Sequence, residues 1–114
     1  MTEQTKRCWT EIKLNSIAEN YSILKARAGI ELCAVIKADA YGHGAARVAR
    51  RLYDEGARFF AVATVDEAVT LRESGLNADL LILGYTPSKY LYETRNLNLT
   101  QSIISYDALE EYRS

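Results

Sequence analysis

The sequence predicts an α/β fold built on parallel strands. Short apolar runs recur along the chain, a stretch with helical periodicity follows each run, and successive runs begin about 20 to 27 residues apart. That spacing leaves room for a strand, a helix and two short loops, which is the unit that joins parallel strands. Right-handed connections between such units build either a doubly wound open sheet or a (β/α)8 barrel, and the periodicity does not separate the two.

Four runs are expected to form the strands, at residues 32–36, 59–63, 80–83 and 102–105. Runs that are apolar throughout, rather than alternating, are typical of parallel strands covered on both faces. Four strands would complete a small sheet but only about the first half of an eight-stranded barrel, so the barrel interpretation requires a longer chain. Residues 8–13 alternate in polarity and could form a further strand in a different sheet.

The first expected helix precedes this repeat. Ser16 and Glu19 have the spacing of a capping box, in which two side chains bond free backbone N–H groups at a helix start. Gly29 is expected to end the helix. Its predicted apolar face consists of Ile17, Tyr21, Leu24 and Ala28.

The second expected helix follows the first strand of the repeat, and Gly56 is its candidate C-cap. Helical spacing places Arg47, Arg50 and Arg51 on its solvent face. The residues expected to face the core are Ala45, Val48, Ala49, Leu52 and Tyr53.

The third expected helix begins with a second capping box, formed by Thr64 and Glu67, and ends at Gly75. It is expected to turn Ala68 and Leu71 toward the core.

Two shorter helices are expected in the last third of the chain. One begins at Thr86 and Pro87, because proline suits the first turn of a helix, and the other begins after Ser105.

Composition limits the classes of function. A chain of 114 residues with 48% hydrophobic and 25% charged residues is one globular domain or a piece of a larger protein. A net charge of −1 provides no basic surface for nucleic acid or anionic membrane. No apolar run approaches the about 20 residues that span a bilayer, and no secretory signal is visible. Cys8 and Cys33 have neither zinc-site nor disulfide spacing, so a reduced, cytoplasmic setting is expected.

Functional loops of a parallel α/β fold gather at the carboxyl ends of its strands, which directs attention to Lys37. A structural lysine there would extend its amine to water. A functional lysine would have its pKa lowered by desolvation, leaving an amine able to form a Schiff base or act as a base. Asp39 is expected to cap local backbone amides. His43 is the only histidine, so it is expected to be structural rather than part of a histidine metal cluster.

Residues around Lys37 resemble a known family. The run AVIKADAYGHG at residues 34–44 closely resembles the pyridoxal-phosphate lysine signature of the alanine racemases, and residues 9–21, 60–68 and 81–84 also resemble that family. The resemblance implies a fold-type III pyridoxal-phosphate enzyme, with an eight-stranded α/β barrel, a mostly β second domain and a homodimer with its sites at the interface. Residues 1–114 would be the N-terminal portion of that barrel, and the C-terminal β domain would be absent from them.

The resemblance also implies roles for three residues. Lys37 matches the lysine that binds pyridoxal 5'-phosphate and then serves as one of two acid/base groups. Tyr41 matches a tyrosine beside the cofactor phosphate, although a buried aromatic ring that only packs is the alternative. Leu83 matches an apolar position that lines the cofactor, and core packing explains it equally well. The second acid/base group of the family is a tyrosine from the partner subunit, and no tyrosine of this chain is assigned to that role.

The expected activity is interconversion of L- and D-alanine, a reaction that supplies D-alanine as a peptidoglycan precursor. Two alternatives within the family are a serine racemase and a pyridoxal-phosphate-binding barrel protein without strong turnover. A third alternative, from another class, is a small βα interaction module in which Lys37 is an ordinary surface lysine.

Overall fold

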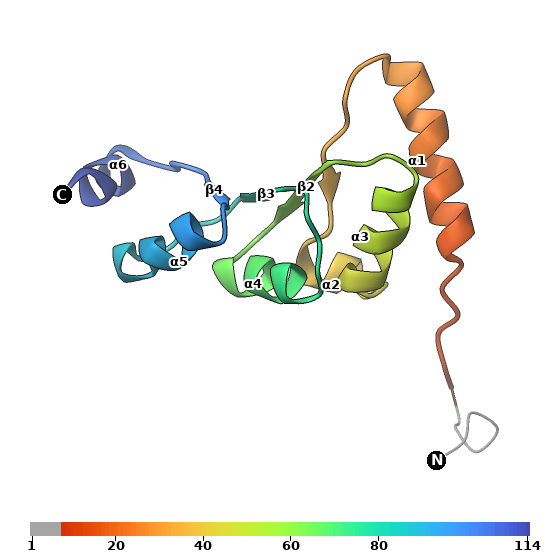
Figure 1. The fold of residues 1–114 in the computed structure, drawn as a ribbon, viewed down its shortest axis with the longest axis horizontal. Helices are drawn as coiled ribbons and strands as arrows, with labels where there is room; N and C mark the ends of the chain where they lie inside the picture. The colour runs from red at the N-terminus through yellow and green to blue at the C-terminus, as the bar shows by residue number, and fades with distance from the viewer. Residues whose placement is uncertain (1–7) are drawn as a thin grey trace.

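A four-stranded, fully parallel sheet forms the centre of the molecule (Figure 1). The computed structural model describes residues 8–114. The strands are β1 (Ala34–Val35), β2 (Phe59–Val62), β3 (Asp79–Ile82) and β4 (Thr100–Gln101). The helices are α1 (Leu14–Ala28), α2 (Lys37–Tyr41), α3 (Ala45–Asp54), α4 (Val65–Glu73), α5 (Leu91–Asn96) and α6 (Tyr106–Arg113), with the 3-10 helix η2 (Ser88–Tyr90) before α5. The α/β class predicted from the sequence is confirmed.

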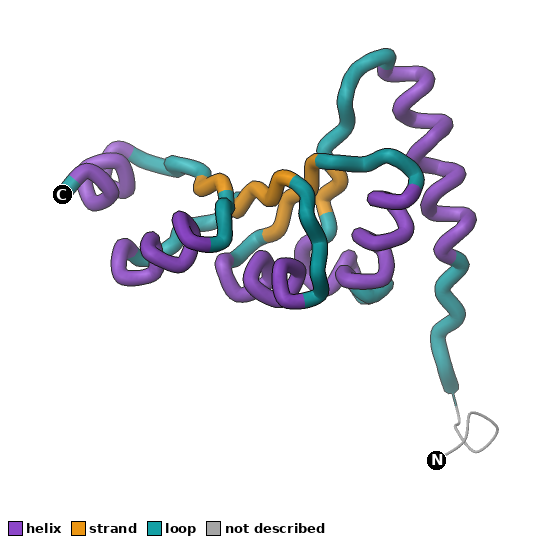
Figure 2. The backbone as a smooth tube through the Cα atoms, viewed as in Figure 1, coloured by secondary structure: helices purple, strands orange, loops and turns teal. Residues whose placement is uncertain are grey.

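The order of the strands decides between the two candidate architectures. Each strand lies beside its successor in the order β1-β2-β3-β4, and α3, α4 and α5 lie along one side of the sheet (Figures 1 and 2). A doubly wound sheet reverses its strand order and carries helices on both faces, whereas a barrel keeps a single direction of winding. The sheet is therefore wound like the first part of a (β/α)8 barrel.

The two faces of the sheet differ in burial. Side chains at even positions of β2 and β3 point to the helices, and all four, Phe60, Val62, Leu80 and Ile82, are fully buried. On the opposite face the small side chain of Ala61 is buried, but Val35 is exposed and Leu81 is half-buried. The core thus lies between the sheet and the helices, and the face that would line the inside of a barrel is open, although the sequence suggested strands covered on both faces.

Helix α1 packs against α3 but does not start as predicted (Figure 1). It begins at Leu14, two residues before Ser16, and its N-cap Lys13 makes no side-chain capping bond, so the predicted Ser16–Glu19 capping box is wrong. Gly29 ends the helix in a left-handed conformation, as expected. Only Ala18 and Tyr21 of α1 are buried, whereas Leu24 of the predicted apolar face is exposed.

Helices α3 and α4 follow the sequence prediction closely. Val48, Ala49 and Leu52 of α3 are buried, and the helix ends at Asp54, before the predicted Gly56. Both reciprocal hydrogen bonds of the predicted Thr64–Glu67 capping box are present at the start of α4. The inward positions Ala68 and Leu71 of that helix are buried as well, as predicted.

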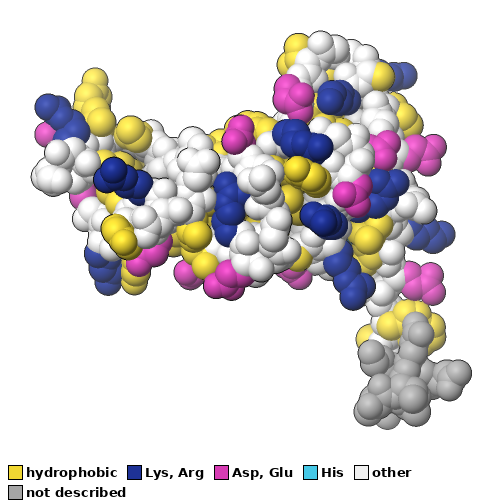
Figure 3. All heavy atoms as spheres, viewed as in Figure 1, with side chains coloured by type: hydrophobic (Ala, Val, Ile, Leu, Met, Phe, Trp, Pro, Cys, Tyr) yellow, Lys and Arg dark blue, Asp and Glu magenta, His cyan; other side chains and the backbone are white. Residues whose placement is uncertain are grey.

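The fourth strand was placed wrongly from the sequence. Ser102 N–H still donates to the Ile82 carbonyl, but the ladder with β3 ends there, and the strand is Thr100–Gln101 rather than residues 102–105. Ile103 and Ile104 are each 56% exposed, and Figure 3 shows hydrophobic side chains exposed near the C-terminus. The Ser105 hydroxyl instead accepts from Ala108 N–H and caps α6, which confirms the helix predicted after Ser105.

The remaining connections are tied by side chains. Pro87 precedes η2 and α5, which agrees with the predicted helix start. The guanidinium of Arg72 donates to the carbonyls of Leu76 and Ala78 before β3 and of Leu97 and Asn98 before β4, so one side chain of α4 fixes two loops.

Residues 8–13 form no strand, so that expectation is wrong. In the described part of the chain no helix has both the length and the apolar character needed to cross a membrane.

Candidate functional site

The carboxyl ends of three neighbouring strands bring the candidate residues to one edge of the sheet. The register aligns β1, β2 and β3 so that Lys37, Ala63 and Leu83 each follow at the same edge. Parallel strands lie about 4.8 Å apart, so the backbones at Lys37 and Leu83 are separated by about 10 Å, with Ala63 between them. Lys37 is half-buried. Lys37 and Leu83 could therefore contact opposite sides of one small molecule bound at this edge.

A left-handed turn follows Lys37 immediately. Ala38, Asp39, Ala40 and Tyr41, none of them glycine, have φ angles of 52 to 55°. The left-handed helical conformation costs an L-residue about 1–2 kcal/mol, so four in succession form an unusually strained segment. Gly42 and Gly44 also have positive φ angles, of 86° and 91°, but the left-handed segment begins four residues before Gly42, at Ala38. Strain of this kind persists where the surroundings hold it, and it clusters at functional sites.

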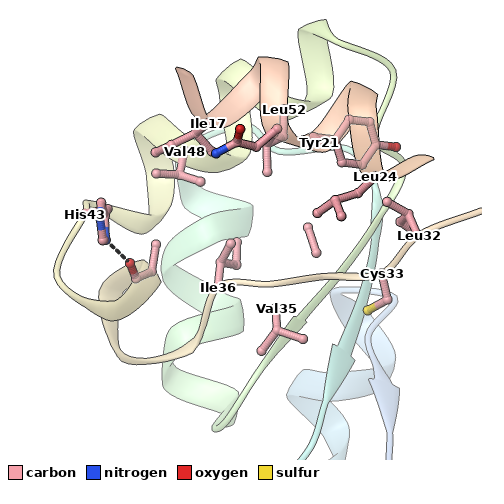
Figure 4. A pocket seen from close by; sticks show the side chains of 13 residues that line it. Ile17, Tyr21, Leu24, Leu32, Cys33, Val35, Ile36, His43, Val48 and Leu52 are labelled. Carbon is pink, nitrogen blue, oxygen red and sulfur yellow. Dashed lines mark hydrogen bonds between the residues drawn. The ribbon is translucent and has the colours of Figure 1, made fainter. Parts of the chain in front are cut away.

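Local hydrogen bonds hold the C-terminal side of this turn. The Asp39 carboxylate accepts from Ala45 N–H at 2.8 Å and so caps the start of α3, which confirms the capping role expected for Asp39. His43 Nδ1 lies 2.9 Å from the Ala40 carbonyl oxygen and donates to it, consistent with its expected structural role (Figure 4). Gly44 N–H donates to the Asp39 carbonyl. The turn is thus fastened to the helix that follows it.

A carboxylate from another element holds the N-terminal side of the turn. Glu67 Oε2 accepts from Ala38 N–H at 2.6 Å, while Oε1 accepts from Ala63 N–H at 2.8 Å and from Thr64 N–H at 3.2 Å. The sequence identified Glu67 as half of a capping box, but its contact with Ala38 joins residues 29 apart in the chain. The spacing of Thr64 and Glu67 therefore predicts the capping role of Glu67. Its hydrogen bond to Ala38 N–H, beside Lys37, can be recognised only in the folded chain.

Tyr41 and Leu83 are both accessible at this edge. In residues 8–114 the Tyr41 side chain is 61% exposed. Leu83 is 38% exposed in the same residues. Gly84 beside it has no room for a side chain, because a Cβ would lie 2.7 Å from the Ala63 carbonyl oxygen. An amine and an apolar side chain at one sheet edge, with a phenol four residues after the amine, fit the chemistry of a phosphorylated aromatic aldehyde.

The loop after β3 is tied to α6 by a carboxylate. Glu111 accepts from the Tyr85 hydroxyl at 2.7 Å and 2.9 Å and from Ser88 N–H at 2.7 Å. The hydrogen bond from Tyr85 is the main cause that lowers the pKa of Glu111, and the same bond raises the pKa of Tyr85. The two shifts agree, because both describe a neutral phenol that donates to a carboxylate.

An apolar cleft of about 350 Å³ lies between α1, α3 and the outer edge of β1 (Figure 4). Its walls include Ile17, Leu24, Ile36, Val48 and Leu52, and none of the described residues that line it is charged. Its polar lining residues are Asn20, Tyr21, Cys33 and His43, and Lys37 is not among the residues that line it, so this cleft is separate from the candidate site. Residues 8–114 also contain no cluster of three or more potential metal ligands.

Comparison with known proteins adds to this geometry. The family model for the alanine racemase N-terminal domain matches residues 12–114. An alanine racemase of Carboxydothermus hydrogenoformans is 47% identical over 96 residues, which cover 83% of this chain and 26% of that protein.

Solved structures agree in fold. The alanine racemase of Clostridium difficile 630 superposes with a TM-score of 0.85 at 35% identity, covering 95% of this chain and 29% of that one. A histidine racemase from Leuconostoc mesenteroides has a TM-score of 0.81 at 26% identity, covering 89% and 27% of the two chains. The chain thus spans between a quarter and three tenths of the length of the relatives it matches.

Proposed function

This chain belongs to the alanine racemase family, and from that premise we propose that it is the N-terminal portion of the barrel of a pyridoxal-phosphate-dependent racemase that interconverts L- and D-alanine. The family depends on pyridoxal phosphate. The parallel sheet aligns with the N-terminal part of the alanine racemase barrel domain. The proposal includes a complete eight-stranded barrel, a second domain and a homodimer.

The observation that carries the proposal is the environment of Lys37. This lysine stands at the end of β1, half-buried, directly before a left-handed turn held by Glu67 and Asp39. Backbone strain of this kind clusters at active sites and ligand-binding segments. A surface lysine in an interaction module needs no such support.

The residues present at the sheet edge fit the cofactor. The Lys37 amine would bind the aldehyde carbon covalently, and the exposed Tyr41 hydroxyl would donate a hydrogen bond to the phosphate. Leu83 would contact the apolar face of the ring. The chemistry that the cofactor supplies when bound is an electron sink for the substrate Cα.

Lys37 would also move a proton. An amine fixed beside the substrate Cα can take the proton from that carbon and return one, because attachment to a strand end holds it within reach. Racemisation needs removal of the proton from one face and delivery to the opposite face, and one lysine serves only one face. A second acid/base group is therefore required, and we assign it to a part of the enzyme beyond these residues.

The choice of substrate is part of the same proposal. Alanine is favoured because relatives matched at 47%, 44% and 43% identity are alanine racemases. A serine racemase remains the alternative substrate class, and the match to a histidine racemase shows that a similar fold also occurs in an enzyme named for a larger amino acid. A cytoplasmic location and peptidoglycan precursor supply are proposed with the alanine activity.

The experiment uses the full-length gene product with added pyridoxal phosphate. Borohydride reduces the bond between a lysine and the cofactor aldehyde, and peptide mass then identifies the modified residue, which we expect to be Lys37. Conversion of L-alanine to D-alanine should accompany this modification, with serine and histidine as competing substrates. Lys37→Ala should abolish both, whereas the exposed Lys89→Ala should change neither.

Modification of another lysine, or none, would contradict the proposed role of Lys37. Modification of Lys37 without turnover of any amino acid would favour the non-catalytic binding protein.

A further inference from the structure

We propose that Glu67 is a positioning residue, which holds the backbone beside Lys37 and thereby fixes the direction in which the lysine leaves the sheet. The proposal deepens the proposed function, because it rests on Lys37 being the residue that binds the cofactor. Glu67 lies on α4, and in the sequence both α3 and β2 come between it and Lys37. It would act through the backbone and would not touch substrate or cofactor.

The two oxygens of Glu67 perform different tasks. Oε1 accepts from Ala63 N–H and Thr64 N–H, and these bonds cap α4 and hold the end of β2. Oε2 accepts from Ala38 N–H at 2.6 Å. Helix capping uses only the first oxygen, since a capping box needs one bond to the N-cap N–H. The second oxygen is therefore free for the turn that follows Lys37.

The bond to Ala38 is placed where the strain begins. Ala38 is the first residue with positive φ after Lys37, and its N–H belongs to the peptide unit that joins the two residues. A bond to a charged acceptor contributes more than one between neutral groups, so it can offset part of the cost of the left-handed turn. Without it, the peptide at Lys37 would be free to rotate toward a right-handed or extended conformation.

Glu67 is itself held firmly. Ala68 and Leu71, the inward residues of α4, are 0% and 1% exposed, and the Glu67 backbone N–H donates to the Thr64 hydroxyl. A carboxylate anchored on a packed helix can fix a backbone from another element, whereas one on a mobile loop cannot. The Glu67 side chain thus connects the packed helix α4 to the backbone beside the candidate catalytic lysine.

Two variants of the full-length gene product separate positioning from capping. Glu67→Gln keeps one oxygen for the α4 cap but places an amide NH2, which cannot accept, where Oε2 stood. Thr64→Ala removes the other half of the capping box and leaves the bond to Ala38 in place. Both proteins should fold, since neither change reaches the core.

Two readouts follow the variants. Amide hydrogen exchange should accelerate about tenfold in residues 38–44 of Glu67→Gln, whereas Thr64→Ala should accelerate exchange about fivefold in α4 alone. Borohydride trapping of pyridoxal phosphate at Lys37 should require about tenfold more cofactor in Glu67→Gln and an unchanged amount in Thr64→Ala.

Equal exchange in residues 38–44 of wild type and Glu67→Gln would overturn the inference, and so would equal cofactor requirement when wild type is trapped at Lys37. Failure of wild type to be trapped at Lys37 would instead contradict the proposed function. The exchange measurement would still decide whether Glu67 holds the turn.

Discussion

The left-handed turn after Lys37 makes an unusual prediction about glycine. Ala38 has a φ of 52° and an exposed side chain that takes no part in the core. Replacing it with glycine removes a left-handed penalty of about 1–2 kcal/mol, while the greater freedom of glycine in the opened state costs about 0.5–1 kcal/mol. The net effect is a stabilisation of the turn by about 0.7 kcal/mol, and the N–H that donates to Glu67 is retained.

Native-state amide hydrogen exchange of the full-length gene product measures this effect, because it reports the free energy of local opening. The amides of Ala40, Gly42 and Gly44, which bond within the turn, should exchange about threefold more slowly in Ala38→Gly. Ala26→Gly provides the matched control, since Ala26 is exposed on the right-handed helix α1. That change should speed exchange in α1 by about fivefold. Faster exchange in the turn of Ala38→Gly, as in the control, would refute the argument from strain.

Three further predictions concern the cofactor, the pH response and the isolated segment. Tyr41→Phe should weaken pyridoxal-phosphate binding by about tenfold in the full-length gene product, with exposed Tyr92→Phe as the control, and equal affinities would reduce Tyr41 to a packing role. Because the pKa of Glu111 is lowered in the folded chain, its contribution is present above the unfolded pKa of about 4.3 and is lost as pH falls through the folded value. The exchange ratio of Glu111→Gln to wild type at Ser88 should therefore exceed one at pH 6 and approach one as the pH falls below the folded pKa of Glu111, whereas a constant ratio would contradict this. Residues 1–114 expressed alone should racemise no amino acid and should self-associate through their open sheet edges, as checked by D-alanine formation and sedimentation, so turnover by a soluble monomer would disprove the need for a second acid/base group.

The sequence alone determined the features that depend on neighbouring residues. The Thr64–Glu67 capping box, the left-handed Gly29 after α1 and the Ser105 cap of α6 are formed by groups at most four residues apart, so a local pattern was able to indicate them. The parallel α/β class was predicted because the alternation of apolar runs and helical stretches can be recognised along the sequence. The eleven-residue run around Lys37 identified the family through its residues, without any geometry.

Two other predictions from the sequence pattern were wrong. Ser16 and Glu19 have capping spacing, but α1 starts earlier at Leu14. The apolar residues Ile103 and Ile104 suggested a strand, but only Thr100 and Gln101 of β4 pair with β3. A strand exists only where a neighbour offers hydrogen bonds in register, and that neighbour is 19 residues away in the pairing of Leu81 with Thr100.

Tertiary structure decided the winding of the sheet, the turn after Lys37 and the second task of Glu67. Strand order requires knowing which strands pair, and periodicity is the same for a barrel and a doubly wound sheet. Ala38 and Ala40 carry no sequence signal for positive φ, because alanine prefers right-handed conformations and adopts the left-handed one only when other contacts compensate for the cost. One such contact comes from Glu67, 29 residues further along the chain, and the chain must fold before that carboxylate meets the peptide beside Lys37.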